Sequence, residues 1–235
     1  MQLFYNSEIS NNSKEFSFNK EESQHIIKVL RKKEGDILHV TNGLGMLFNT
    51  ELNVASERKC IVTIKETHYF KPSEFYIHLA VAPTKMNDRF EWFLEKATEM
   101  GIQEITPIIC DHSERKVIKT DRFDKIIQSA MKQSLQYYIP KLNQPITLKQ
   151  FVNQNHDGNL YVAHCEKSEK KLLKNEIKPA QKYTLLIGPE GDFSEKEIAL
   201  CIEKKYIPVS LGNTRLRTET AAVVACHSFV FSNEI

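Results

Sequence analysis

Two arginines and a glutamate lie within five residues near the end of the chain, in the segment SLGNTRLRTETAA (residues 210–222). A guanidinium group can stabilise an anion that develops during a reaction, and a carboxylate can accept a proton. Arg215, Arg217 and Glu219 therefore form a candidate catalytic group, and Arg217 is the first choice for anion stabilisation. Glu219 has a second interpretation, because a carboxylate at the start of a helix also stabilises the helix dipole.

Two turns that contain glycine lie beside this group. The turn GPEG (residues 188–191) follows a predicted strand at Thr184–Ile187, and Gly212 ends a second strand at Pro208–Leu211. A helix is expected after each turn, the first from a capping box at Ser194. Successive strand–turn–helix units indicate ligand-binding loops at the carboxyl ends of parallel strands. The glycines at 188, 191 and 212 are expected to let the backbone approach the ligand closely.

The rest of the chain predicts two domains, at residues 1–70 and 74–235, joined by a linker at residues 71–74. Residues 74–235 alternate strands with helices, which predicts an α/β domain with a mostly parallel sheet covered on both faces. Its other predicted elements are strands at 75–82, 105–110 and 160–165, and helices at about 88–100, 122–138 and 147–154. Asp88 and Glu91 are expected to cap the first of these helices. Residues 1–70 predict a small β-barrel with one helix, from strands at 3–5, 37–41, 46–54 and 60–67.

Composition narrows the class of protein. The net charge of the 235 residues is only +2, so any nucleic-acid surface must be a local patch. One candidate is the predicted helix capped by Asn19, where Lys28, Arg31 and Lys32 precede Gly35. These cations either contact nucleic acid or simply stabilise the helix end.

Five cysteines without a C-x-x-C pair indicate buried free thiols and argue against a disulfide framework or a metal site. The polar start and the absence of long apolar runs predict a cytoplasmic protein without membrane segments.

Three segments together resemble one known family. GPEGDFSEKEI (188–198) followed by SLGNTRLRTETAA (210–222), with HIIKVLRKKEGD (25–36) earlier in the chain, is similar to the signature of the 16S rRNA uracil-N3 methyltransferases. The resemblance implies a C-terminal knotted domain of the SPOUT class preceded by a PUA-like barrel. It also implies S-adenosylmethionine as cofactor, 16S rRNA of the small ribosomal subunit as substrate, and a homodimer. The spacing itself does not indicate the knot.

The resemblance assigns the cofactor to three loops, at the end of the strand 160–165, at the GPEG turn and at 211–216. The implied cofactor-binding residues are His164, Leu186, Gly188, Glu190, Gly191, Ser210, Leu211, Gly212 and Leu216. His164 also has a purely structural interpretation, because a histidine at a strand end needs only one hydrogen-bonded partner.

The implied substrate gives the catalytic group a specific task. N3 of uracil is protonated at neutral pH, so Arg217 would stabilise the ring as it loses this proton, and Glu219 would either take the proton or cap the helix. RNA contacts are expected at Lys28, Arg31 and Lys32. Arg115, Lys116 and Lys119 of SERKVIK (113–119) could hold phosphates or could form a solvated basic face.

The sequence departs from the family pattern at Lys132 and Gln136, so roles at those two positions are not transferred. Tyr137 and Tyr138 could stack on bases or could pack a helix end. The sequence therefore predicts an S-adenosylmethionine-dependent enzyme that methylates uracil N3 in 16S rRNA. The alternatives are a knotted methyltransferase for another nucleotide, such as a tRNA ribose 2′-OH, and a non-enzymatic RNA-binding protein.

Overall fold

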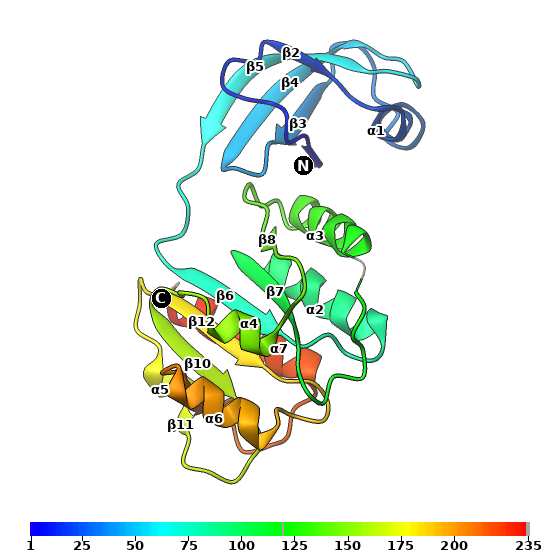
Figure 1. Ribbon diagram of the computed structural model, residues 1–235. Helices are drawn as coiled ribbons and strands as arrows, with labels where there is room; N and C mark the ends of the chain where they lie inside the picture. Colours follow the sequence, from blue (N-terminus) through cyan, green and yellow to red (C-terminus); the bar gives the residue numbers. More distant parts are fainter. Residues whose placement is uncertain (119, 234–235) are drawn as a thin grey trace. The chain divides into compact units, whose positions relative to one another are not determined.

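The computed structural model describes residues 1–118 and 120–233, and these residues form two compact units (Figure 1). The N-terminal unit contains Met1–Pro72 together with Met131–Ile139. The C-terminal unit contains Ser73–Ala130 and the described residues from Pro140 onward. A short segment from the second half of the chain is therefore part of the N-terminal unit.

The N-terminal unit is built on a curled sheet, which has five strands in the described residues, in the order β1-β3-β4-β5-β2. The strands are β1 (Leu3–Tyr5), β2 (Glu15–Ser17), β3 (Ile37–Thr41), β4 (Met46–Val54) and β5 (Ile61–Tyr69). β1 pairs with β3 in parallel, and the other pairs are antiparallel. The bounds predicted for β1, β3 and β4 are confirmed, whereas β2 was missed. Phe4, Ile26, Val40, Phe48 and Leu52 form the centre of its core.

The helix of this unit begins as the sequence predicts and ends earlier. Asn19 caps α1 (Lys20–Gln24), since its side chain accepts a hydrogen bond from the Glu22 amide at 2.9 Å. A π-helical turn, η1 (His25–Val29), continues the helix. Arg31 then takes a φ of 54°, and the Lys32 amide donates to the carbonyl of Ile26. This hydrogen bond spans six positions, one more than in a Schellman motif, because it follows a π-helical turn, and Arg31 takes the left-handed position usually held by glycine. The predicted helix end at Gly35 is therefore wrong.

Residues 131–139 pack against the sheet of the N-terminal unit. The Tyr137 ring stacks on Phe70 with centroids 4.2 Å apart, and the Tyr138 hydroxyl donates to the Phe70 carbonyl at 2.8 Å. The Gly45 amide donates to the Tyr137 carbonyl. The packing interpretation of the two tyrosines is the correct one. The predicted helix end at Tyr138 is wrong, because α3 (Asp121–Gln133) ends within this segment and Leu135 takes a φ of 57°.

The C-terminal unit contains a parallel sheet of eight strands in the described residues. The order is β11-β13-β10-β12-β6-β7-β8, and β9 also pairs with β7. The strands are β6 (Tyr76–Val81), β7 (Glu104–Ile109), β8 (Lys141–Leu142), β9 (Ile146–Thr147), β10 (Asn159–Ala163), β11 (Lys171–Leu172), β12 (Lys182–Ile187) and β13 (Ile207–Ser210). The predicted parallel sheet is therefore confirmed.

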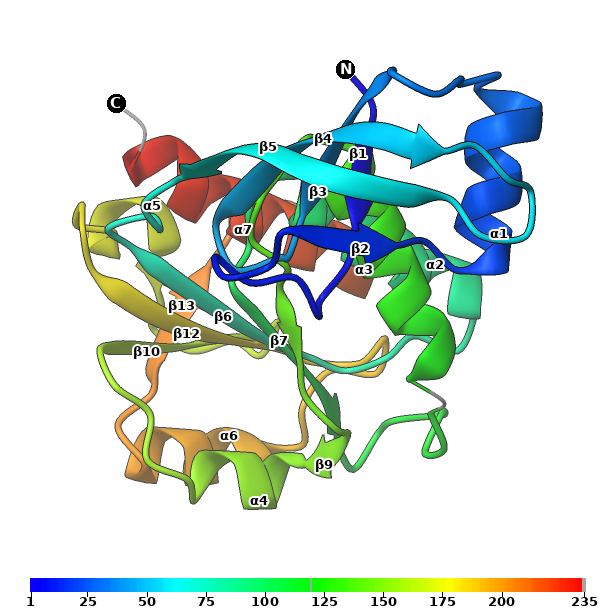
Figure 2. The ribbon, with the colours of Figure 1, turned by 90° about the horizontal axis from the view of Figure 1, so that it is seen from above.

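Helices cover both faces of this sheet (Figure 2). α4 (Leu148–Val152) and α6 (Glu195–Glu203) pack together on one face, and α2 (Asn87–Glu99) and α7 (Thr218–Asn233) lie on the other. The short α5 (Leu173–Glu176) follows β11. The described helices include none with the length and apolar character that crossing a bilayer requires. The knot remains a prediction.

One predicted helix cap is replaced by other contacts, and another is confirmed. Met86 occupies the N-cap position of α2 without a side-chain hydrogen bond, and Glu91 pairs with Arg122 at 2.7 Å. The predicted cap pair of Asp88 and Glu91 is therefore wrong. The capping box of α6 is confirmed.

Candidate functional site

The carboxyl ends of β10, β12 and β13 surround two adjoining cavities of about 390 Å³ and 320 Å³. Both cavities are lined by Ala163, Cys165 and Ile187 at the strand ends, and by Arg215 and Leu216 from the loop before α7. Strands in parallel end at the same edge of the sheet, so segments far apart in the sequence meet there.

The larger cavity has both apolar and polar walls. Leu211 and Leu216 supply apolar surface, and Ser210, His164 and Lys170 supply polar groups. The Ser210 hydroxyl donates to the Gly212 carbonyl at 2.8 Å, which fixes the start of the loop. Gly212 also lines the cavity and has a φ of 144°, which side-chain-bearing residues rarely adopt.

The residue His164 lines the edge of this cavity, and its backbone carbonyl accepts a hydrogen bond from Lys170 Nζ at 3.0 Å. Its side chain is buried, with 7% of the residue exposed, and neither ring nitrogen has a partner among the described residues. Burial lowers the pKa of His164, and the neighbouring Lys170 lowers it further. A neutral imidazole carries one donor and one acceptor, and both normally find partners when buried. The His164 imidazole is therefore a buried polar group beside this cavity that lacks a partner among the described residues.

The smaller cavity is lined by the GPEG turn and by the start of α7. Gly188 and Glu190 face it from the turn, and Arg215 and Arg217 face it from the other side. The Thr218 hydroxyl donates to the Gly188 carbonyl at 3.1 Å, so the first residue of α7 is tied directly to the turn. One cavity therefore brings together a glycine turn and two guanidinium groups.

Two predicted site residues, Leu186 and Gly191, line neither cavity. Leu186 is fully buried in the core under α4 and α6. Gly191 is glycine for a packing reason, because a Cβ there would lie 3.0 Å from the Cβ of His112. Gly188 lines the smaller cavity and is also closely packed, because a Cβ there would meet the Phe193 ring at 3.1 Å.

Glu219 is buried against α2 and is not fully paired. Its Oε1 lies 3.9 Å from the Nε of Arg89, and its Oε2 has no hydrogen-bond partner among the described residues. A buried carboxylate with one unpaired oxygen is costly, so this group has capacity for a proton or a donor. Sequence reasoning missed Arg89. An arginine in the first turn of a helix has the sequence signature of an ordinary solvated residue. Arg89 also lies 130 positions before Glu219, so no local pattern relates the two.

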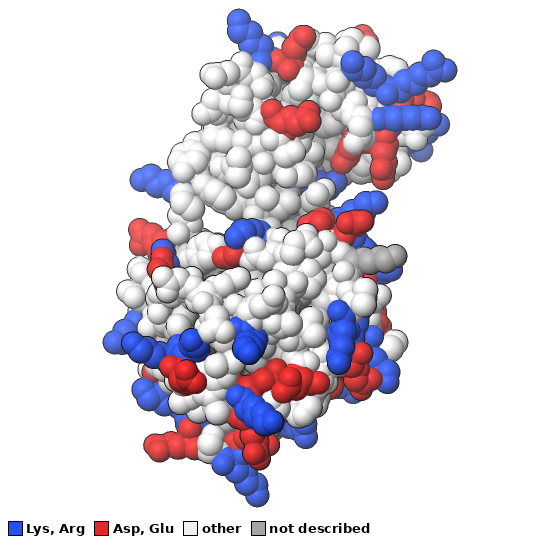
Figure 3. Space-filling model, in the orientation of Figure 1, with Lys and Arg blue, Asp and Glu red and all other residues white. Residues whose placement is uncertain are grey.

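The predicted RNA-binding residues are charged side chains in or near contact with solvent. Arg115 lines a third cavity of about 610 Å³ together with Lys85 and Arg122, and Lys116 is exposed. Lys28 pairs with Glu57 at 2.9 Å, Arg31 is exposed and Lys32 is half-buried. Lys119 lies outside the described residues. Figure 3 shows basic and acidic side chains interspersed on the visible face of each unit, in keeping with the small net charge.

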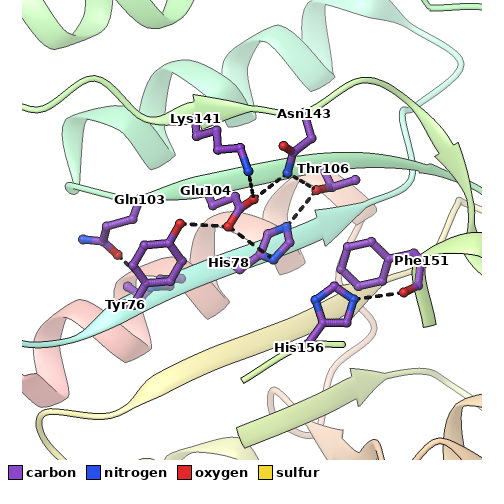
Figure 4. A network of polar contacts seen from close by, with 10 residues as sticks. Tyr76, His78, Gln103, Glu104, Thr106, Lys141, Asn143, Phe151 and His156 are labelled. Atoms are coloured by element: carbon purple, nitrogen blue, oxygen red, sulfur yellow. Dashed lines mark hydrogen bonds and ion pairs between the residues drawn. The ribbon is translucent and has the colours of Figure 1, made fainter. Parts of the chain in front are cut away.

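A fourth cavity, of about 510 Å³, lies at the opposite, amino ends of β6, β7 and β12. Figure 4 shows the polar network beside it. The Glu104 carboxylate accepts hydrogen bonds from the Tyr76 hydroxyl at 2.8 Å, Lys141 Nζ at 2.9 Å and Asn143 Nδ2 at 2.7 Å. Burial lowers the pKa of His78 to about 4. These groups satisfy one another, so we interpret the network as structural.

Most of the cysteine thiols are buried. Cys60, Cys110, Cys201 and Cys226 are buried free thiols as predicted, whereas Cys165 is exposed at the shared wall of the two strand-end cavities. The described residues contain no group of three or more His, Cys, Asp or Glu placed to hold a metal ion.

Similarities to known proteins agree with this site. Residues 71–230 match the family model described as RNA methyltransferase domain, and residues 18–65 match the RNA methyltransferase PUA domain. Ribosomal RNA small subunit methyltransferase E of Buchnera aphidicola is 33% identical, over 90% of this chain and 86% of its own length.

Solved structures extend the similarity to the whole fold. A probable rRNA-methyltransferase from Porphyromonas gingivalis has a TM-score of 0.92 at 34% identity, covering 100% of this chain and 99% of its own. A Legionella pneumophila protein assigned as a methyltransferase, solved with its bound cofactor SAM, has a TM-score of 0.87 at 29% identity and covers 98% and 97% of the two chains.

Proposed function

Because the chain belongs to the family of ribosomal RNA small subunit methyltransferase E, we propose that it is an S-adenosylmethionine-dependent enzyme that methylates N3 of a uridine in 16S rRNA. The observation that supports this proposal best is the pair of cavities at the ends of β10, β12 and β13, where neither ring nitrogen of His164 has a partner among the described residues. The division into a PUA-like domain at 1–70 and a methyltransferase domain at 74–235 belongs to the same proposal. Its ribosomal substrate places the enzyme in the cytoplasm.

The residues of the larger cavity fit this cofactor. S-adenosylmethionine has an apolar-faced adenine with hydrogen-bonding edges, and it supplies an activated methyl group when bound. We assign its binding to His164, Ser210, Leu211, Gly212 and Leu216, which offer imidazole, hydroxyl, backbone and aliphatic contacts. Gly188 and Glu190 extend this site into the smaller cavity. Leu186 and Gly191 are left out, because their contacts lie within the protein.

The smaller cavity supplies the acid–base chemistry. Arg217 faces it and can stabilise the uracil ring as N3 loses its proton. Arg215 is beside it and adds to the positive potential. Glu219, two residues along α7, has a buried oxygen without a partner among the described residues, so it is our candidate for the proton acceptor, with Arg89 as the neighbouring cation.

RNA contacts are proposed on both units. Arg31 and Lys32 on the N-terminal unit, and Arg115 and Lys116 on the C-terminal unit, are cations in or near contact with solvent that can reach phosphates. Lys28 completes the first group if the RNA displaces its partner Glu57.

We further propose that the enzyme is a homodimer. Trp92 on α2 and Phe231 on α7 expose 43% and 58% of their surfaces on the helices of one face of the sheet. Large exposed aromatic side chains are enriched at interfaces between proteins. Sedimentation of the purified protein tests this, and a monomer at micromolar concentration would contradict it.

The function is tested by incubating the protein with 16S rRNA or small subunits and S-adenosylmethionine carrying a labelled methyl group. Nucleoside mass spectrometry should then find the label in 3-methyluridine. Label on a ribose would instead indicate the 2′-OH as acceptor. Tight RNA binding without any affinity for S-adenosylmethionine would identify a non-enzymatic RNA-binding protein.

A further inference from the structure

Asp192, directly after the GPEG turn, adopts a backbone conformation that is unfavourable for its residue type. Its φ is 63°, in the left-handed region, where a residue with a Cβ is disfavoured and glycine is not. The turn itself does not need a side chain at this position, since the Asp192 amide closes it by donating to the Pro189 carbonyl at 2.9 Å. The aspartate must therefore contribute something that glycine would not.

The Asp192 carboxylate bonds to two different segments. Its Oδ2 accepts a hydrogen bond from the backbone amide of Cys165 at 2.7 Å, and its Oδ1 accepts one from the amide of Phe193 at 2.9 Å. Phe193 is its neighbour at the entrance to α6, whereas Cys165 lies 27 positions away, just after β10. Hydrogen bonds to a charged acceptor are among the strong ones in proteins.

The contact with Cys165 joins two walls of the candidate site. Cys165 lines both strand-end cavities, and Asp192 lines the smaller one. His164, with its unpaired ring nitrogens, immediately precedes the tethered amide. The backbone of the turn is held from its other side, because His112 Nδ1 lies 3.0 Å and 3.1 Å from the carbonyl oxygens of Gly191 and Asp192.

We propose that Asp192 is a positioning residue, whose carboxylate tethers the segment after β10 to the GPEG turn and thereby sets the enzyme's affinity for its cofactor. The inference rests on the proposed function, because it takes the cofactor to be S-adenosylmethionine. Preorganised walls raise affinity, since their ordering does not have to occur during binding. The unfavourable left-handed backbone conformation of Asp192 accompanies this tether.

The test compares Asp192→Gly with Asp192→Asn, and Lys205→Gly serves as a matched control. Lys205 also has a left-handed backbone, with a φ of 66°, and it is exposed at the end of α6. Both glycine variants relieve backbone strain, but only Asp192→Gly removes the tether. Calorimetry with S-adenosylmethionine should show about 10-fold to 100-fold weaker binding for Asp192→Gly, the loss expected for one charge-assisted hydrogen bond.

The other two variants should bind S-adenosylmethionine more tightly than Asp192→Gly does. Asp192→Asn should lose less affinity, because its amide oxygen still accepts a hydrogen bond and asparagine tolerates the left-handed region. Lys205→Gly should bind S-adenosylmethionine as the wild type does. Hydrogen exchange of the Cys165 amide in the protein without ligand should be faster in Asp192→Gly than in the other proteins.

Each outcome separates the tether from the proposed function. If the wild-type protein binds S-adenosylmethionine and Asp192→Gly binds it equally well, the tether is refuted. The same conclusion follows if exchange at Cys165 is unchanged, or if Lys205→Gly loses affinity as strongly as Asp192→Gly. A wild-type protein that binds no S-adenosylmethionine would instead overturn the proposed function.

Discussion

Replacing Glu104 with glutamine should destabilise the C-terminal unit by an amount that depends on pH. The Glu104 carboxylate is largely buried, with 13% of its side chain exposed, and it accepts three hydrogen bonds of 2.7–2.9 Å. Burial acts to raise its pKa, but Asn143, His78, Lys141 and Tyr76 together outweigh burial and lower the pKa to about 2. A glutamine in its place would turn an NH₂ group toward one of these donors.

The size of the effect on stability follows from the pKa shift of Glu104. The pKa falls from its ordinary value of 4.5 to about 2, and each pKa unit corresponds to about 1.4 kcal/mol. The full effect on the free energy of unfolding would therefore be about 3 kcal/mol. The carboxylate borders an open cavity, so solvent screening reduces this to about 1–2 kcal/mol. Because the folded pKa lies below the unfolded one, the stabilisation is complete above about pH 5 and is lost as pH falls towards 2.

His78 adds a second pH-dependent contribution of the same sign. Nε2 of His78 lies 2.7 Å from the Thr106 hydroxyl, which also accepts a hydrogen bond from Asn143, and Nδ1 lies 3.7 Å from the Glu104 carboxylate. Burial lowers the pKa of His78 from 6.5 to about 4. Stability from the neutral imidazole is complete above pH 6.5 and is lost as pH falls towards 4.

The assay is urea unfolding followed by the fluorescence of Trp92, the only tryptophan, which lies on α2 of the same unit. The free energy of unfolding should be about 1–2 kcal/mol lower for Glu104→Gln than for the wild type at pH 7, and the difference should vanish near pH 2. Glu203→Gln, on the exposed end of α6, is the control and should change little at any pH. A difference that is absent at pH 7, or that stays constant from pH 7 to pH 3, would refute this account.

Three other predictions concern the proposed enzyme. Arg217→Ala should lower kcat by ~10²–10³-fold in the labelled-methyl assay with little change in cofactor affinity, and lost affinity at an unchanged rate would move Arg217 into the cofactor site. Gly212→Val should weaken S-adenosylmethionine binding in calorimetry, because the φ of 144° at Gly212 disfavours a side chain. The control is Gly35→Val, at a φ of 90° in the other unit, which should leave S-adenosylmethionine binding unchanged. Replacing Arg31 and Lys32 with alanine should weaken rRNA binding and lower its salt slope by about 1 per lost phosphate contact, and unchanged filter-binding curves would contradict that role.

Local signals explain what the sequence predicted well. A cap or capping box involves residues three positions apart, so Asn19 and the pair Ser194–Glu197 could be located from spacing. The apolar runs of β3 and β4 had their bounds fixed by the same kind of short-range pattern. The loops around the candidate site were found because glycine permits backbone angles closed to other residues and proline restricts them, both of which are local signals of a turn.

Contacts between distant residues could not be predicted in this way. The approach of Arg89 to Glu219 and the Asp192–Cys165 tether join side chains and amides that no periodic pattern relates. Left-handed residues such as Arg31 were missed because glycine is the usual signal for that conformation. Sequence reasoning therefore located the loops of the site and misjudged several contacts that hold them.

The segment Met131–Ile139 limits how far the two predicted domains can be treated as separate modules. The chain crosses between the units after Pro72, after Ala130 and after Ile139. In the N-terminal unit Tyr137 stacks on Phe70 and Lys132 pairs with Glu22 at 3.0 Å, so part of its packing comes from the second half of the sequence. The lysine that departs from the family pattern thus has a structural role inside the N-terminal unit. A PUA-like domain cut at residue 70 would lack these contacts, so its RNA affinity has to be measured on the full chain.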